Sequence, residues 1–151
     1  MNNSVEAMRI ANIEIQNEEQ CIFCNVWIPI EPITNQHGSA FGGSIYSLAL
    51  ITGWSLISAE LSDHLAVIQE ANIKYKRPVI GPFLLAKCIV QRSSEEYSNI
   101  LKLKNEKIKG KVNIEIKVYS VKAVIQDVNE STAEAEAIMT AKFHAAPCAF
   151  H

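Results

Sequence analysis

The residues with the clearest chemical potential lie in one glycine-rich stretch, Asn35 to Ser44, which reads NQHGSAFGGS. An apolar run follows directly, so we expect Gly42-Gly43-Ser44 to form the N-terminus of a helix. The first N–H groups of a helix have no partner within the helix, and that end carries partial positive charge. Glycines there let a ligand approach the backbone closely. The stretch is therefore a candidate site for stabilising an oxygen atom that develops negative charge.

Two titratable side chains, His37 and Glu70, are candidates for proton transfer. His37 lies within the glycine-rich stretch, and histidine ordinarily titrates near neutral pH, which suits general acid–base catalysis. Glu70 lies on a predicted strand, where alternation puts it on the same face as Ile68 and Asn72. Each also has a simpler interpretation, because loop histidines and polar strand faces are commonly just solvated.

The apolar run after the glycines, residues 45–61, has the composition of a helix that other elements must cover. No residue between Thr34 and Ala59 carries a formal charge if His37 is neutral. A helix that is apolar on all sides is buried, so we expect a central helix wrapped by a sheet. A membrane span is the alternative, since it needs about 20 apolar residues. Against a span, four serines fall within roughly 80° on one helical face, which suits close packing: Ser44, Ser47, Ser55 and Ser58.

Alternating apolar and polar residues predict about six strands, largely antiparallel because most of the connections are short. In the third strand, alternation places Val67, Ala71, Ile73 and Tyr75 on one face. The expected strands are Ile10–Ile15, Cys21–Ile30, His64–Arg77, Phe83–Gln91, Lys111–Val118 and Glu134–His144.

Two local signals refine this pattern. Ser93-Ser-Glu-Glu96 predicts a capping box and a short amphipathic helix before the fifth strand. A break in the alternation at Tyr119-Ser120 predicts either a bulge or a change of environment near the end of that strand.

Length and composition predict one domain over residues 1–151, with a core from about residue 10 to residue 145. The chain is 48% hydrophobic and 20% charged with net charge −2, which is typical of a globular protein and argues against a nucleic-acid surface. The first ten residues contain no apolar signal segment, so we expect a cytoplasmic protein. Cys21 and Cys24 form a CxxC on a predicted strand, where this spacing points the two sulfurs to opposite faces. We therefore expect buried cysteines and no metal site.

Several residues together carry a resemblance to a known family. They are Asn35, Gly38, Ser39-Ala-Phe-Gly-Gly-Ser44, Tyr46, Gly53-Trp54, Tyr75-Lys-Arg-Pro78, Gly81 and the segment from Glu95 to Lys111. With six strands and an apolar helix, this pattern resembles the hotdog fold, and more closely the thioesterase-like family named after the C-terminal domain of the acetyltransferase YiiD. The resemblance covers roughly Ile10 to Ala145. It implies an α+β fold in which an antiparallel sheet wraps around a long central helix.

The resemblance also implies an activity, the hydrolysis of an acyl thioester of coenzyme A or acyl carrier protein. The route would be water-mediated and free of metal, with coenzyme A or phosphopantetheine entering as part of the substrate. The Gly43 N–H would stabilise the oxyanion, Asn35 would orient the reacting group, and Glu70 or His37 would activate water.

Substrate contacts follow from the same resemblance. Phe41, Gly42 and Ser44 would line the cradle, and Tyr75 and Arg77 would extend it along the third strand. Arg77, with Lys74, would meet the phosphates of coenzyme A or of a carrier's prosthetic arm.

A homodimer or a dimer of dimers is implied as well, because one copy alone exposes a sheet edge and one side of the helix. In the family, the acyl site lies between the subunits.

Two departures from related enzymes leave other functions open. Many hotdog thioesterases have histidine where this chain has Phe41, and a helix carboxylate near the position of Leu50. Loss of that carboxylate is also what a non-catalytic acyl-binding protein would show. A hydratase or dehydratase needs a paired histidine and carboxylate, and we find no such motif. A purely structural module, with side chains filling the acyl tunnel, is the remaining alternative.

Overall fold

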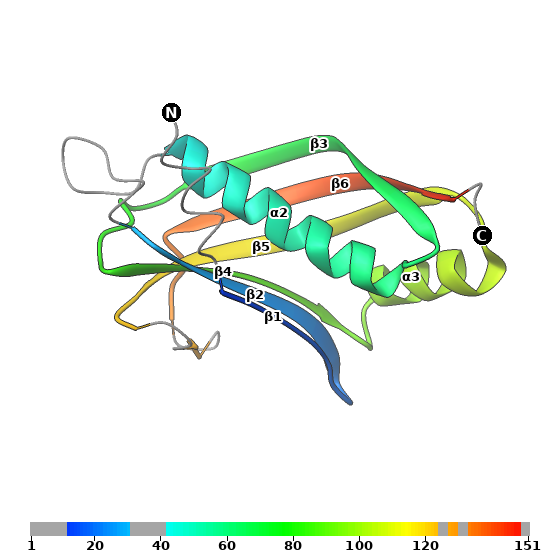
Figure 1. The fold of residues 1–151 in the computed structure, drawn as a ribbon, viewed down its shortest axis with the longest axis horizontal. Coiled ribbons are helices and arrows are strands. Elements are labelled where there is room, and N and C mark those ends of the chain that lie inside the picture. The colour runs from blue at the N-terminus through cyan, green and yellow to red at the C-terminus, as the bar shows by residue number, and fades with distance from the viewer. Residues whose placement is uncertain (1–11, 31–41, 124–126, 130–132, 149–151) are drawn as a thin grey trace.

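The computed structural model describes residues 12–30, 42–123, 127–129 and 133–148 (Figure 1). Within these ranges the chain forms six strands and two helices. The helices are α2 (Gly42–Glu60) and α3 (Glu95–Glu106). The strands are β1 (Asn12–Asn17), β2 (Cys21–Pro29), β3 (His64–Tyr75), β4 (Phe83–Gln91), β5 (Gly110–Val121) and β6 (Ala137–Pro147).

All six strands belong to one antiparallel sheet with the order β1-β2-β4-β5-β6-β3. Strands β1 and β3 are therefore the two edges of this sheet. Figure 1 shows α2 lying along one face of the sheet, with α3 at the end where α2 finishes. The predicted α+β arrangement of a curved antiparallel sheet and a long apolar helix is confirmed, and so is the short helix before β5.

One side of α2 packs against the sheet, and the other side remains exposed. The buried side follows the spacing of three and four residues that one helical face requires: Ser44, Ile45, Leu48, Ala49, Thr52, Gly53, Leu56 and Ile57. Ile51 and Trp54, in contrast, are 40% and 43% exposed. A single copy thus leaves one side of the helix exposed, as the family resemblance implies, whereas the expectation from composition that the rest of this chain covers the helix on all sides is wrong.

The closest contact between α2 and the sheet occurs at Gly53. A Cβ atom at this position would lie 2.5 Å from Cδ1 of Ile114 and 3.0 Å from Cδ1 of Ile116, both on β5. Ser47, one of the four serines expected to form the close-packing stripe, is exposed instead. The close approach therefore depends on one glycine more than on the serine face.

The third strand contains an irregularity that changes which residues share a face. Its pairing with β6 shifts register between Ile68 and Glu70, so Gln69 is an extra residue. Ile68 pairs with the buried Phe143 on the α2 side, whereas Glu70 pairs with Lys142 on the outer face. The prediction that Glu70 and Ile68 share a face is thus wrong. Val67 is likewise separated from Ala71, because a bulge shifts the alternation by one residue.

The cap of α3 and the end of β5 refine the other two local predictions. Ser94, one residue later than the predicted start of a capping box, caps α3 by accepting a hydrogen bond from the Tyr97 N–H at 3.1 Å. The end of β5 is buried on both faces, which explains the break in alternation at Tyr119 as a change of environment. A second apolar cluster covers the outer face there, formed by Trp27, Leu85, Tyr119, Val121 and Ala135.

Cys24 and Cys88 face each other on β2 and β4 and are fully buried in the core, as expected for small apolar side chains, whereas Cys21 is only half-buried. Burial raises the pKa of the Cys24 thiol to about 12, so it stays protonated and unreactive at neutral pH. Neither of the described helices is long and apolar enough to cross a membrane.

Replacing Gly53 with valine should destabilise the fold by about 2 kcal/mol, because the added atoms collide with Ile114 and Ile116. Ala59, an exposed residue on the same helix, provides the matched control. Ala59→Val should cost only about 0.5 kcal/mol, through the lower helix propensity of valine. Urea unfolding monitored by circular dichroism measures both changes, and equal losses would contradict the close contact.

Candidate functional site

The N-terminus of α2 is the described part of the predicted cradle. The helix begins at Gly42, Gly43 is exposed, and Ser44 is buried. No acidic residue lies in the first turn, so the helix has no side-chain carboxylate there to offset the positive end of its dipole. The arrangement leaves the Gly43 backbone accessible to an oxygen atom of a ligand.

Tyr75 holds this helix end in place. Its hydroxyl donates a hydrogen bond to the Gly42 carbonyl oxygen at 2.7 Å, which connects the last residue of β3 to the first residue of α2. The ring lies against Gly42, where an added Cβ would be 3.5 Å from the ring carbon Cζ. Burial, together with the nearby Tyr46, raises the pKa of Tyr75 above its ordinary value. The phenol is therefore protonated at neutral pH, and its contribution is lost only as pH rises through that raised pKa.

Three of the predicted site residues, Asn35, His37 and Phe41, lie outside the described residues. Their roles stay predictions. Of the predicted cradle, the structure brings together Gly42, Gly43 and Ser44 at the helix start, with Tyr75 directly beside them.

Glu70 lies apart from this cradle. Its side chain is 73% exposed and forms an ion pair with Lys142 at 3.5 Å on the outer face of the sheet, whereas α2 covers the other face. There it borders a polar hollow of about 560 Å³, whose outer-face lining includes Asn72, Gln91, Asn113, Glu115 and Thr140. Within one chain, Glu70 and Gly43 are not brought together, and the catalytic role of Glu70 stays a prediction.

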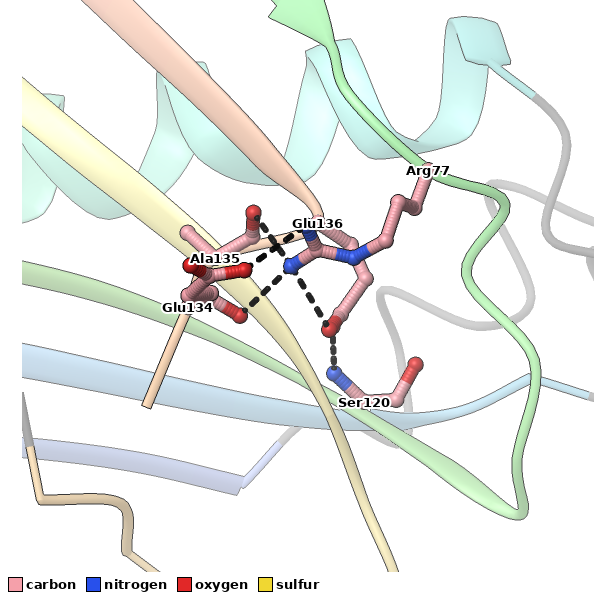
Figure 2. Close-up of polar contacts among 5 residues, drawn as sticks. All are labelled: Arg77, Ser120, Glu134, Ala135 and Glu136. Atoms are coloured by element: carbon pink, nitrogen blue, oxygen red, sulfur yellow. Dashed lines mark hydrogen bonds and ion pairs between the residues drawn. The ribbon is translucent and has the colours of Figure 1, made fainter. Parts of the chain in front are cut away.

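Arg77 is held in a network of its own, shown in Figure 2. Its guanidinium donates to the Glu134 carboxylate at 3.2 Å and to the carbonyl oxygens of Glu134 and Ala135 at 3.0 and 3.1 Å. Glu136 lies 3.7 Å from the same guanidinium and accepts a hydrogen bond from the Ser120 N–H. The network joins the chain after β3 to the chain before β6, so these donors already have protein partners. A role for Arg77 in binding phosphate stays a prediction.

An apolar hollow between α2 and β3 was not expected as a discrete feature. It has a volume of about 320 Å³ and is lined by Leu50, Ile51, Trp54, Ala66, Val67, Ile68 and Phe143. Several of these side chains are large and well exposed, with Val67 at 48% and Ile68 at 41%. The hollow borders the edge strand β3, whose one partner in the described sheet is β6. The signals in the sequence were the uncharged surface of the helix and the side of it that the family resemblance leaves exposed in one copy.

Replacing Tyr75 with phenylalanine should lower the free energy of unfolding by about 0.5–1 kcal/mol, because Gly42 loses its hydrogen bond. Tyr46→Phe removes the same hydroxyl from a neighbouring tyrosine of α2 and should change stability less. Hydrogen exchange at the first turn of α2 would show the local effect. Unchanged exchange in Tyr75→Phe would mean that the hydrogen bond does not hold the helix end.

Comparison with known proteins places these features in a family. Residues 6–129 match the YiiD_C family model, described as "Putative thioesterase (yiiD_Cterm)". A "putative thioesterase" from Shewanella oneidensis has a similar structure, with TM-score 0.69, 20% identity and coverage of 94% of this chain and 87% of that chain.

Two further solved structures are similar to this chain. A protein of unknown function from Chlorobaculum tepidum has TM-score 0.68 and 23% identity, covering 90% of this chain and 83% of that one. A thioesterase from Haemophilus influenzae has TM-score 0.65 and 15% identity, covering 98% and 85%. These structures have the hotdog fold, in which an antiparallel sheet curves around a long helix, as it does here. The chain therefore belongs to the thioesterase-like family named after the C-terminal domain of YiiD.

Proposed function

We propose that this protein hydrolyses acyl thioesters of coenzyme A or acyl carrier protein at the N-terminus of α2. The observation that carries the proposal is the exposed Gly43 at a helix start without acidic residues, in a chain of a thioesterase-like family. A helix end of this kind stabilises an oxyanion by hydrogen bonding and by its dipole.

The reaction begins when water attacks the thioester carbonyl, forming a C–O bond and placing negative charge on the carbonyl oxygen. The Gly43 N–H donates to this oxyanion, and Asn35 orients the water or the carbonyl. Collapse of the intermediate breaks the C–S bond and releases the acid and the thiol. A general base takes the proton of the attacking water and returns a proton to the departing sulfur.

His37 and Glu70 are the two candidates for this base. Glu70 points away from the cradle of its own chain and is paired with Lys142, which favours His37. His37 also lies five residues before Gly42 in sequence, close enough for a short loop to bring it to the helix start.

A second copy of this chain would complete the site. Among the described strands β3 has a neighbour on one side alone, and the adjoining hollow exposes Ile51, Trp54 and Ile68. An edge strand bordered by exposed apolar side chains favours pairing with another strand. We propose that β3 pairs antiparallel with β3 of a partner subunit about a two-fold axis, so that both hollows are covered.

The activity test is hydrolysis of a series of acyl-CoA and acyl carrier protein thioesters by the parent protein, three site variants and one control variant. We expect Asn35→Ala and His37→Ala to lower kcat/KM about 100-fold or more, and Glu70→Gln to have a smaller effect. Glu115→Gln, another outer-face carboxylate beside the same polar hollow, is the matched control for Glu70.

A 100-fold loss in Glu70→Gln with full activity in His37→Ala would instead assign the base to Glu70. No turnover on any thioester, while acyl-CoA still raises the Tm, would favour the non-catalytic acyl-binding function.

The assembly can be tested separately. The parent should sediment as a dimer of about twice 16.8 kDa. Ile68→Glu should convert it to monomer, because the new charge lies in the apolar hollow. Ile13→Glu, at an exposed isoleucine on the opposite sheet edge, should remain dimeric. A parent that sediments as a monomer would contradict the proposed pairing.

A further inference from the structure

Positive charge is concentrated in one short segment of the chain, residues 102–111. It contains five of the fourteen basic residues, and Glu106 is its one acidic residue. The segment therefore has net charge +4, while the other nine basic and fifteen acidic residues give −6. We call the five cations the lysine patch: Lys102, Lys104, Lys107, Lys109 and Lys111.

The lysine patch is exposed, and its backbone is held by a helix, a strand and a hydrogen bond to the loop between them. It covers the last turn of α3, the left-handed C-cap Lys107, the following loop and the start of β5. All five lysines are exposed, and none forms an ion pair with another described residue. The loop is anchored by a hydrogen bond between His64 Nε2 and the Ile108 carbonyl oxygen at 2.9 Å. Ile108 itself is 38% exposed, so the patch also presents one apolar side chain.

In a single subunit the lysine patch is far from the proposed reaction site. The anchoring His64 begins β3, four residues after α2 ends at Glu60. Helix α2 has 19 residues, and at 1.5 Å per residue its N-terminus is about 28 Å from that end. Figure 1 likewise shows α3 at the end of the molecule opposite the start of α2.

In the proposed dimer, the lysine patch of one subunit lies close to the reaction site of the other subunit. Antiparallel pairing of two β3 strands places the His64 end of one beside the Tyr75 end of the other. Tyr75 is hydrogen-bonded to Gly42, so the Tyr75 end marks the start of α2. The lysine patch of one subunit therefore flanks the reaction site of the partner subunit.

We propose that the lysine patch docks the acidic face of an acyl carrier protein and presents its thioester to the partner subunit's site. The proposal rests on the proposed thioesterase function and on the β3 dimer. Coenzyme A phosphates call for donors that converge on a compact group. These lysines are instead spread over a helix turn, a loop and a strand, and none of them lines either hollow described above. Flexible lysine side chains spread over such a surface are complementary in charge to an extended acidic protein surface.

Binding of fluorescently labelled holo acyl carrier protein, measured by anisotropy at low salt, tests the docking surface directly. The triple variant Lys104→Glu/Lys107→Glu/Lys109→Glu should raise Kd about tenfold or more. The matched single reversals Lys109→Glu and Lys117→Glu should differ, because Lys117 lies on the outer face of β5 outside the patch. Only Lys109→Glu should weaken binding. Carrier protein that binds the triple variant as tightly as the parent would overturn the proposal.

Hydrolysis distinguishes the carrier from coenzyme A. In the triple variant, kcat/KM for the acyl carrier protein should fall about tenfold, while that for acyl-CoA of the same chain length should change less than twofold. Equal losses on both substrates would mean that the patch serves the anionic thiol carrier in general, against this proposal. If neither thioester is hydrolysed by the parent, the proposed function fails, and the binding measurement still decides the docking surface. Binding of the parent to anionic phosphatidylglycerol vesicles but not to carrier protein would indicate a lipid partner instead.

A mixed dimer tests the crossing between subunits. One subunit carries the triple patch variant and the other carries Asn35→Ala, so each homodimer is impaired with acyl carrier protein. If the patch serves the partner's site, the mixed dimer has one intact patch beside one intact site and recovers up to half of the parent activity per dimer. Failure to recover activity would show that patch and site must belong to the same chain.

Discussion

The position of the candidate site depends on how closely helix α2 can lie against the sheet. At Gly53 the helix backbone comes so near to Ile114 and Ile116 that a methyl group would not fit without displacing them. This contact lets one face of the helix pack against the sheet, while Ile51 and Trp54 lie toward the edge strand β3 and stay 40% and 43% exposed. The start of the helix, where the proposed chemistry takes place, is three turns from this contact. It is held by a separate hydrogen bond from Tyr75. A close approach in the middle and a tether at one end therefore position the glycines together.

Sequence periodicity predicted most of the fold because most strands bury one face and expose the other. This pattern located β2, β4 and β5 closely, and the uncharged run located α2. It failed on β3, where the extra residue Gln69 puts Ile68 and Glu70 on opposite faces of the sheet. A strand that carries both polar and apolar residues on each face contains no local signal of such a bulge, because the bulge is defined by pairing with β6. Periodicity alone also could not show that one face of α2 is left uncovered, since composition does not reveal what packs against a helix; that expectation came from the family resemblance.

The candidate site could be predicted only in part, for related reasons. The glycines at the start of α2 and the tyrosine of β3 were identified from type and spacing, and the structure places Gly42 and Tyr75 side by side. Arg77 was interpreted as a phosphate contact, but it meets Glu134 and Glu136, which are nearly sixty residues away in sequence. Those partners are brought near by the pairing of β3 with β6, which no local pattern encodes. Asn35, His37 and Phe41 lie outside the described residues, and their roles still rest on sequence.

The two edges of the sheet differ in a way that bears on how the protein assembles. Strand β1 is six residues long and alternates the exposed Ile13 and Ile15 with Glu14 and Gln16, so it forms the shorter of the two edges. Strand β3 is twice as long, but its bulge interrupts the regular spacing of backbone donors and acceptors along the chain. A strand with one such interruption matches best a strand interrupted in the same way, and two-fold pairing brings those interruptions into a symmetric relation. In the proposed dimer, further growth of the sheet would depend on the shorter edge alone, since each edge exposed after pairing is a β1. The irregularity that confounded the sequence pattern would in this way protect the protein against open-ended fibre formation.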